Sequence, residues 1–180
     1  MMENQGDNLK PNKHTAFPLT KESVDETLHR ILGKTQSVVG ATLRETIALQ
    51  KNPSLFAVLE IISGSGYFRP YVYKEGAVWM HKFLREQAEL RGEQLPLVSG
   101  DQVRSFFHDQ QEEDEDKKGR YLRVKKTIET EEPELGRAFD ELSKDLEEKD
   151  VVDFYNGGFD VYSLIRGAVS SQALEDKFGL

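Results

Sequence analysis

Apolar residues recur every three or four positions along most of the chain, which is the spacing typical of amphipathic helices. The pattern begins with Val24, Leu28 and Ile31 on one helical face, and Ser23 and Glu26 have the spacing of a capping box at its start. The same spacing predicts further helices, which cover about residues 36–51, 53–62, 75–91, 101–107, 135–146 and 160–169.

Residues 36–51 and 55–62 carry their apolar residues in two different patterns. In residues 36–51, the side chains of Val39, Leu43 and Ile47 are four positions apart, which predicts a helix that ends before Pro53. Residues 55–62 form a short, nearly continuous apolar run, which is also compatible with a buried strand.

Two other segments carry a β pattern. Residues 67–73 are aromatic and β-prone but are interrupted by Pro70, which predicts an ordered connection or a short edge strand. Residues 120–128 alternate, with Leu122, Val124 and Ile128 on one side and polar side chains on the other, which is compatible with a short strand.

A turn is predicted before the last of these helices, at about residues 160–169. Residues 156–158, with the sequence Asn-Gly-Gly, predict a turn, after which Asp160 would cap the last helix. Taken together, the patterns predict a mainly α fold, a compact bundle of about six or seven helices with at most a small β-hairpin or edge strand.

The pattern also predicts how the chain is organised. Residues 1–18 are rich in Asn, Lys and Pro and lack periodicity, so we expect a flexible N-terminal arm. Residues 19–180 are expected to form a single helical domain. A sub-boundary is predicted at the charged loop 110–119, where five consecutive acids precede Lys117 and Lys118.

Composition narrows the class of protein. With 37% apolar and 31% charged residues, the chain has enough apolar side chains for a core, which disfavours wholesale disorder. The absence of cysteine excludes disulfides, thiolate nucleophiles and cysteine-based zinc sites, and it matches a reducing compartment. No apolar stretch is long enough to span a membrane, and the N-terminus lacks a secretory pattern. A cytoplasmic protein without a membrane segment is therefore predicted.

Charge is distributed unevenly. Residues 1–110 hold 13 basic and 13 acidic side chains, whereas residues 111–180 hold 11 and 19, so the net charge of −8 lies in the last 70 residues. An acidic half repels phosphate backbones, which disfavours nucleic-acid binding. A basic cluster with one aromatic member is nevertheless the best candidate for nucleic-acid contact, although acidic runs flank it; its members are Lys117, Lys118, Arg120, Tyr121, Arg123, Lys125 and Lys126.

An aromatic quartet is the candidate interaction surface. If exposed, four aromatic side chains in seven residues would supply a large contact area for a partner. Packing against Trp79 and Phe83 would instead make them core, which is the favoured interpretation. The members of the quartet are Tyr67, Phe68, Tyr71 and Tyr73.

No motif predicts a catalytic residue, a cofactor or a metal. Residues 64–66, Gly-Ser-Gly, lack the third glycine of a dinucleotide loop, because Arg69 stands in its place. The histidines form no HExxH pattern, and the spacing of Asp25 and His29 favours a helical ion pair over a metal site. Serine-nucleophile and phosphate-loop motifs are also missing, so the sequence leans away from an enzyme.

Three functions stay open, in a definite order. We expect a non-enzymatic protein–protein interaction or regulatory protein, whose acidic half or aromatic quartet contacts another protein or, as a homodimer, a second copy of the chain. The second hypothesis is a nucleic-acid-associated regulator that uses the basic cluster at 117–126. The third is an enzyme or small-ligand-binding protein whose site assembles from residues distant in sequence.

Overall fold

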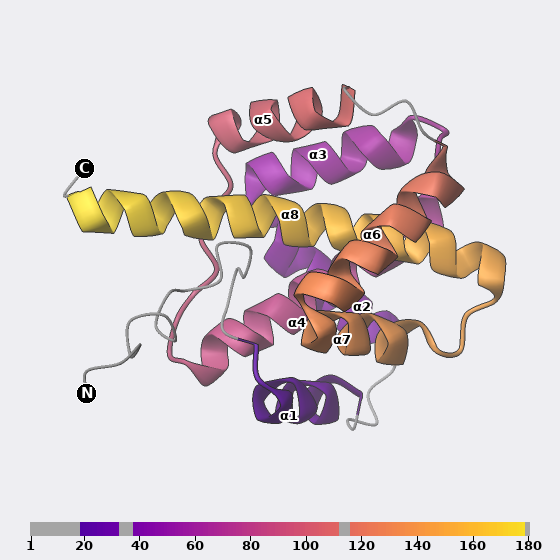
Figure 1. The fold of residues 1–180 in the computed structure, drawn as a ribbon, viewed down its shortest axis with the longest axis horizontal. Coiled ribbons are helices and arrows are strands. Elements are labelled where there is room, and N and C mark those ends of the chain that lie inside the picture. The colour runs from indigo at the N-terminus through magenta and orange to yellow at the C-terminus, as the bar shows by residue number, and fades with distance from the viewer. Residues whose placement is uncertain (1–18, 33–37, 112–115, 179–180) are drawn as a thin grey trace, which may run out of the picture.

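The computed structural model describes residues 19–32, 38–111 and 116–178, and these form eight helices and no strand (Figure 1). The mainly α prediction is therefore confirmed, with slightly more helices than expected. The helices are α1 (Lys21–Leu32), α2 (Val38–Gln50), α3 (Pro53–Gly64), α4 (Pro70–Leu90), α5 (Gly100–Gln111), α6 (Lys117–Glu131), α7 (Pro133–Ser143) and α8 (Glu148–Phe178).

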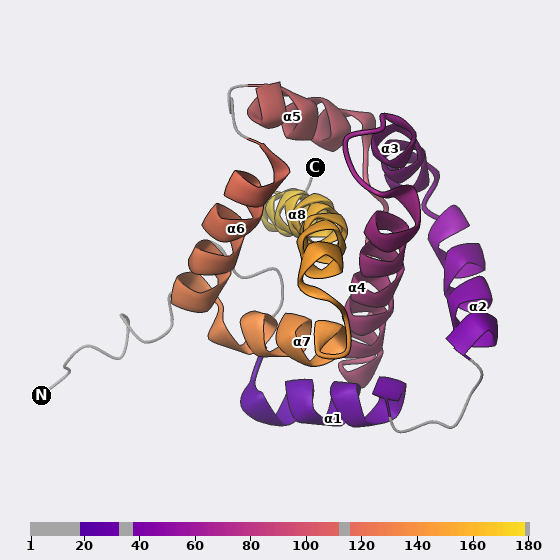
Figure 2. The same cartoon turned by 90° about the vertical axis from the view of Figure 1, so that its right-hand side faces the viewer.

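The longest helix, α8, runs through the middle of the molecule. Figure 2 looks nearly along α8 and shows α4, α5, α6 and α7 around it. The pair formed by α4 and α8 is the most extensive helix packing in the structure, while α1 packs on α4 and α7, and α2 packs on α4 and α3. The part of α8 that the other helices surround must be apolar or internally paired around most of its circumference, whereas Ser170, Gln172 and residues 175–177 are exposed.

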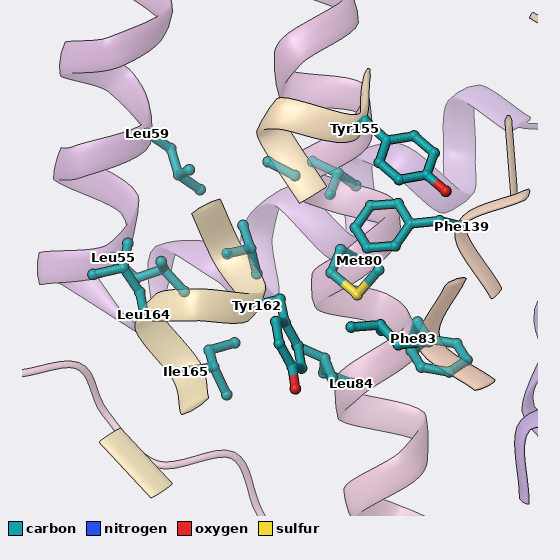
Figure 3. Packing of buried hydrophobic residues seen from close by; sticks show 14 of the residues in the cluster. Leu55, Leu59, Met80, Phe83, Leu84, Phe139, Tyr155, Tyr162, Leu164 and Ile165 are labelled. Atoms are coloured by element: carbon teal, nitrogen blue, oxygen red, sulfur yellow. The ribbon is translucent and has the colours of Figure 1, made fainter. Parts of the chain in front are cut away.

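The apolar core lies where α3, α4, α7 and α8 meet (Figure 3). Aromatic rings stack within it, since Phe139 of α7 and Tyr155 of α8 are 4.4 Å apart between ring centroids. The other labelled side chains of this cluster are Leu55, Leu59, Met80, Phe83, Leu84, Tyr162, Leu164 and Ile165.

Glycines let α4 and α8 cross in backbone contact. A Cβ atom on Gly157 would lie 2.0 Å from the carbonyl oxygen of Tyr73, and one on Gly76 would lie 2.0 Å from that of Phe154. Such contact overrides the usual cost of glycine inside a helix. The turn predicted at residues 156–158 is therefore wrong, because α8 continues through it.

The segments with a β pattern belong to helices or their connections. Helix α4 begins at Pro70, whose fixed φ suits a first helical position. In α6, the side chains of Arg120, Val124 and Ile128 are buried at four-residue spacing, and the Asp116 side chain caps the helix. The short strand expected at 120–128 is therefore wrong: Val124 and Ile128 belong to one buried helical face, while Leu122 is exposed.

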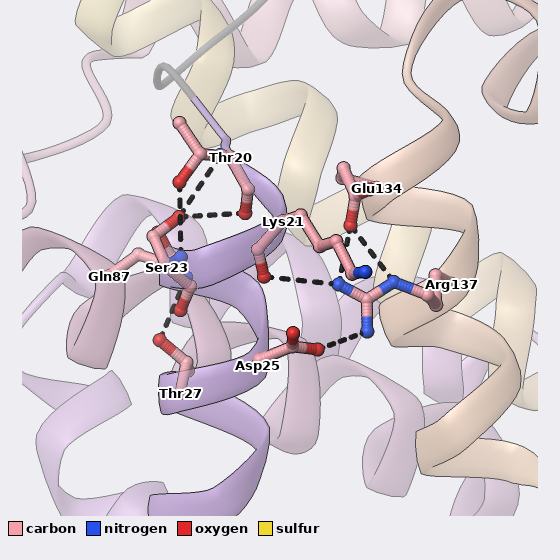
Figure 4. A network of polar contacts seen from close by, with 8 residues as sticks. All are labelled: Thr20, Lys21, Ser23, Asp25, Thr27, Gln87, Glu134 and Arg137. Carbon is pink, nitrogen blue, oxygen red and sulfur yellow. Dashed lines mark hydrogen bonds and ion pairs between the residues drawn. The ribbon is translucent and has the colours of Figure 1, made fainter.

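Two expectations for α1 are corrected by the structure (Figure 4). The capping box is formed by Thr20 and Ser23, because each backbone N–H donates to the other's hydroxyl at 3.1 Å. The ion pair predicted between Asp25 and His29 is wrong: Asp25 instead binds Arg137 of α7, with 2.5 Å between Oδ1 and Nη1. The carboxylate therefore ties α1 to α7.

Two sequence features lie outside the described residues: the predicted arm 1–18 and the acids at 112–115. Within the part of the chain that the structure describes, no helix is both long and apolar enough to cross a membrane.

Candidate functional site

The aromatic quartet is divided between core and surface. Phe68 and Tyr73 are buried and stack on each other with 4.8 Å between ring centroids. Tyr71 is 91% exposed at the start of α4, and Tyr67 is also exposed. The predicted core role thus describes two of the four rings, and the other two reach the surface.

Tyr73 belongs to a buried polar network that joins α4, α6 and α8. Its hydroxyl donates to Asp160 at 2.6 Å, and Arg120 donates to the other Asp160 oxygen at 2.5 Å and to the Asn156 side chain. Burial, followed by the charge of Asp160, raises the pKa of Tyr73, and burial also raises the pKa of Asp160. Asp160, expected as a helix cap, instead lies inside the bundle.

The basic cluster faces several directions from α6. Lys117 pairs with the buried Asp153 at 3.0 Å, and Arg120 is inside the network just described. Tyr121 packs edge-on against Tyr155. Lys118, Arg123 and Lys126 are exposed, and Lys125 is half-buried.

An apolar groove of about 750 Å³ runs between α2, α3 and α4. Two of the side chains that line it are apolar and exposed, Leu43 at 61% and Tyr71 at 91% exposure. Clustered exposed apolar side chains around a concave surface are typical of a binding site. The residues that line the groove include Leu43, Leu49, Phe56, Leu59, Tyr71 and Ala77.

The rotation of α2 explains why Leu43 and Ile47 face outward. The spacing of these residues predicts the helix, and in the structure both side chains are exposed. The side of α2 that faces α4 carries Glu45, which binds His81 and Arg85 of that helix. Because a buried carboxylate needs its partners, these contacts orient the helix and leave the two apolar side chains at the surface.

Charged residues flank the groove. Lys74 pairs with Glu60 at 2.8 Å, so the positive charge of this lysine is compensated. Glu75 is partly buried, and burial followed by the nearby Asp150 carboxylate raises its pKa. With two acids and one paired lysine, the groove carries a net negative charge when Glu75 is ionised.

Neither the groove nor the other described clusters point to metal chemistry, since no group of three His, Asp or Glu side chains in the described ranges could hold an ion. Sequence analysis missed Leu43 and Ile47 as surface residues. The sequence feature that could have identified them is the presence of apolar residues on more than one side of α2: Leu49 is buried, whereas Leu43 is exposed.

Comparison with known proteins gives no information on function, so a proposal must rest on the geometry of the described residues. The chain matches no protein-family model, no curated protein and no solved structure.

Proposed function

We propose that this protein is a non-enzymatic interaction protein that binds an amphipathic helix of a partner protein in the groove between α2, α3 and α4. The supporting observation is the pair of exposed apolar side chains, Leu43 and Tyr71, that line the groove of about 750 Å³. A helix-in-groove complex buries apolar side chains spaced at i, i+4 and i+7 in such a surface. Tyr71 supplies the aromatic contact that often dominates binding energy.

Charge favours a basic partner over a second copy. Because Glu60 pairs with Lys74, Glu75 is the acid that leaves the groove negative when it is ionised, and the chain as a whole carries a net charge of −8. A second copy would bring the same charge to the interface, whereas lysines or arginines beside the apolar face of a partner helix would be attracted. Because the chain lacks cysteine, we keep the cytoplasm as the compartment of this encounter.

The nucleic-acid hypothesis receives less support than the protein partner. Lys117 and Arg120 are engaged with the buried carboxylates of Asp153 and Asp160. Their charges are therefore compensated within the fold, which weakens the attraction of the cluster for phosphates.

The test uses a fluorescein-labelled amphipathic peptide with leucines at i, i+4 and i+7 and lysines beside them. We expect fluorescence anisotropy to show a dissociation constant on the order of 10 μM or below. A scrambled peptide and a version with glutamates in place of the lysines should bind at least about tenfold more weakly.

Matched surface variants locate the binding site. Leu43→Asp combined with Tyr71→Ala should abolish peptide binding, while Leu122→Asp, at an exposed apolar residue of α6, should leave it unchanged. Thermal unfolding should be similar in all variants, because the altered side chains are exposed.

Two results would overturn the proposal. One is peptide binding that the groove variants do not weaken. The other is a dimer in sedimentation velocity that Leu43→Asp dissociates, because the groove would then serve a second copy instead of a different protein.

A further inference from the structure

A small pocket of about 340 Å³ lies between the end of α3, the residues that follow it, and α5. Helices α3 and α5 lie side by side (Figures 1 and 2). Most of the side chains that line the pocket are apolar, and four of them are aromatic. The apolar lining residues are Ile61, Ile62, Tyr67, Phe68, Phe106 and Phe107.

Two aromatic pairs form the walls of this pocket. Gly66, whose φ of 79° lies in the left-handed region, turns the chain after α3. Tyr67 and Phe68 follow it and meet edge to face, with 4.8 Å between ring centroids. On α5, Phe106 and Phe107 meet in the same way at 5.5 Å. Because aromatic rings attract further rings through both edges and faces, these walls favour an aromatic ligand.

The volume of the pocket limits the size of the ligand. An apolar cavity of about 150 Å³ holds one benzene molecule. A pocket of about 340 Å³ therefore suits a molecule of about one or two rings, and it lies at the lower end of the range for small-molecule sites.

The charged residues that line the pocket compensate each other. Arg120 of α6 donates from Nη2 to Asp160 of α8 and from Nη1 to Asn156, but its Nε is buried without a hydrogen-bond partner among the described residues. Buried polar atoms are normally paired, so this nitrogen is an unused donor. The pairing of Arg120 with Asp160 leaves the lining neutral, which favours an uncharged ligand.

Gln110, near the end of α5, supplies a polar group that a ligand can reach. Its side chain is half-buried in the lining and forms no hydrogen bond within the described part of the chain. The hydroxyl of Ser65 is already used, because it donates to the Ile62 carbonyl at 2.7 Å and accepts from the Tyr67 N–H at 3.3 Å. The Gln110 amide is therefore the group that can orient a ligand among the aromatic rings.

We propose that this pocket binds an uncharged aromatic molecule of about one or two rings whose ring nitrogen or carbonyl oxygen accepts a hydrogen bond from the Gln110 amide, with Nε of Arg120 as a second donor. The pocket is separate from the apolar groove between α2, α3 and α4, and the proposal does not depend on the function assigned to that groove.

Three probes with the same ring system test this proposal. Quinoline carries a nitrogen that accepts hydrogen bonds, naphthalene has no acceptor, and naphthoate adds a negative charge. We expect quinoline, which is uncharged at neutral pH, to bind with a dissociation constant on the order of 0.1–1 mM. Nuclear magnetic resonance titration of isotope-labelled protein should show shifts at the backbone amides of residues 61–68 and 106–110. Naphthoate should bind no more tightly than quinoline.

Gln110→Leu isolates the hydrogen bond, because leucine keeps a similar volume without the amide. We expect this variant to bind quinoline at least about threefold more weakly and to bind naphthalene no more weakly than the unmodified chain. A purely structural role of Gln110 would change the affinity for both probes alike. Gln50→Leu, at an exposed glutamine of α2, is the matched control and should not change either affinity.

Ile61→Asp tests the apolar lining independently. Ile61 is 62% exposed, so the variant should fold normally, yet the new charge should weaken the binding of quinoline and naphthalene at least about fivefold. Leu43→Asp, in the apolar groove, should leave both affinities unchanged.

Three results would overturn the proposal. One is the absence of quinoline-induced shifts at residues 61–68 and 106–110. Another is tighter binding of naphthoate than of quinoline. The third is binding of quinoline by Gln110→Leu or Ile61→Asp as tight as by the unmodified chain.

Discussion

Gly157 touches the backbone of α4 so closely that no side chain fits. We predict that Gly157→Ala lowers the free energy of unfolding by about 3 kcal/mol, because the added Cβ would lie 2.0 Å from the Tyr73 carbonyl oxygen and would force the helices apart. Urea unfolding followed by circular dichroism measures this.

Gly167→Ala is the control within the same helix. Its Cβ would lie 3.9 Å from the nearest atom, in the Gln102 side chain, so the better helix propensity of alanine should raise stability by about 0.5–1 kcal/mol. Equal effects of the two variants would contradict the proposed backbone contact.

Glu45 should make the protein sensitive to acid. Its pKa falls from the ordinary 4.5 to about 2 on folding, so the folded state binds the proton more weakly than the unfolded state. The stabilisation is present above about pH 4.5 and is lost as the pH falls toward 2, with a total of about 3 kcal/mol.

Comparison of unfolding at pH 5 and pH 2.5 checks this contribution. The stability of Glu45→Gln should fall less steeply with acid than that of the unmodified chain. Glu26→Gln, at an exposed surface pair with Arg30, should follow the unmodified chain. A decline for Glu45→Gln as steep as that of the unmodified chain would argue against this role.

Helix α6 is attached to α8 by a buried ion pair. We predict that Arg120→Met destabilises the protein by about 3–5 kcal/mol, because Asp160 would remain buried without its cation. The double variant Arg120→Met, Asp160→Asn should recover part of this loss, since asparagine is neutral and keeps an oxygen for the Tyr73 hydroxyl. A double-mutant cycle from urea unfolding measures the coupling, and additive effects would show that the pair contributes little.

The local spacing of apolar residues predicts most of the helices, but it does not predict the positions where one helix packs closely on another. The pattern around Met80 and Leu84 correctly predicts the body of α4, whereas the aromatic residues before it favour a strand. The turn signal at 156–158 fails because the glycines serve the packing of α8 on α4, which local sequence does not reveal.

The same limit applies to the candidate sites. Tyr71 and Tyr67 are part of a predicted surface, whereas the spacing of Leu43 and Ile47 predicts a helix but not which of its sides is exposed. The orientation of α2 depends on Glu45 meeting His81 and Arg85, which are 36 and 40 positions away. Contacts between residues so far apart in the sequence cannot be predicted from the spacing of apolar residues within one helix.

The arrangement around α8 predicts that the described helices unfold as one unit. Trp79, the single tryptophan of the chain, reports on α4, while circular dichroism reports on all helices. Because α4 packs along α8, the two signals should give coincident urea transitions. An earlier transition by circular dichroism would instead support a domain boundary at 110–119.

The meeting of α4 with α8 also affects biosynthesis. Tyr73 contacts Gly157, and Gly76 contacts Phe154, so the principal packing joins segments about 80 residues apart. During translation, the α4 surface that α8 covers stays exposed until the last helix has been made, because a chain grows from its N-terminus. A nascent chain that stalls before α8 would therefore present this surface to chaperones and proteases.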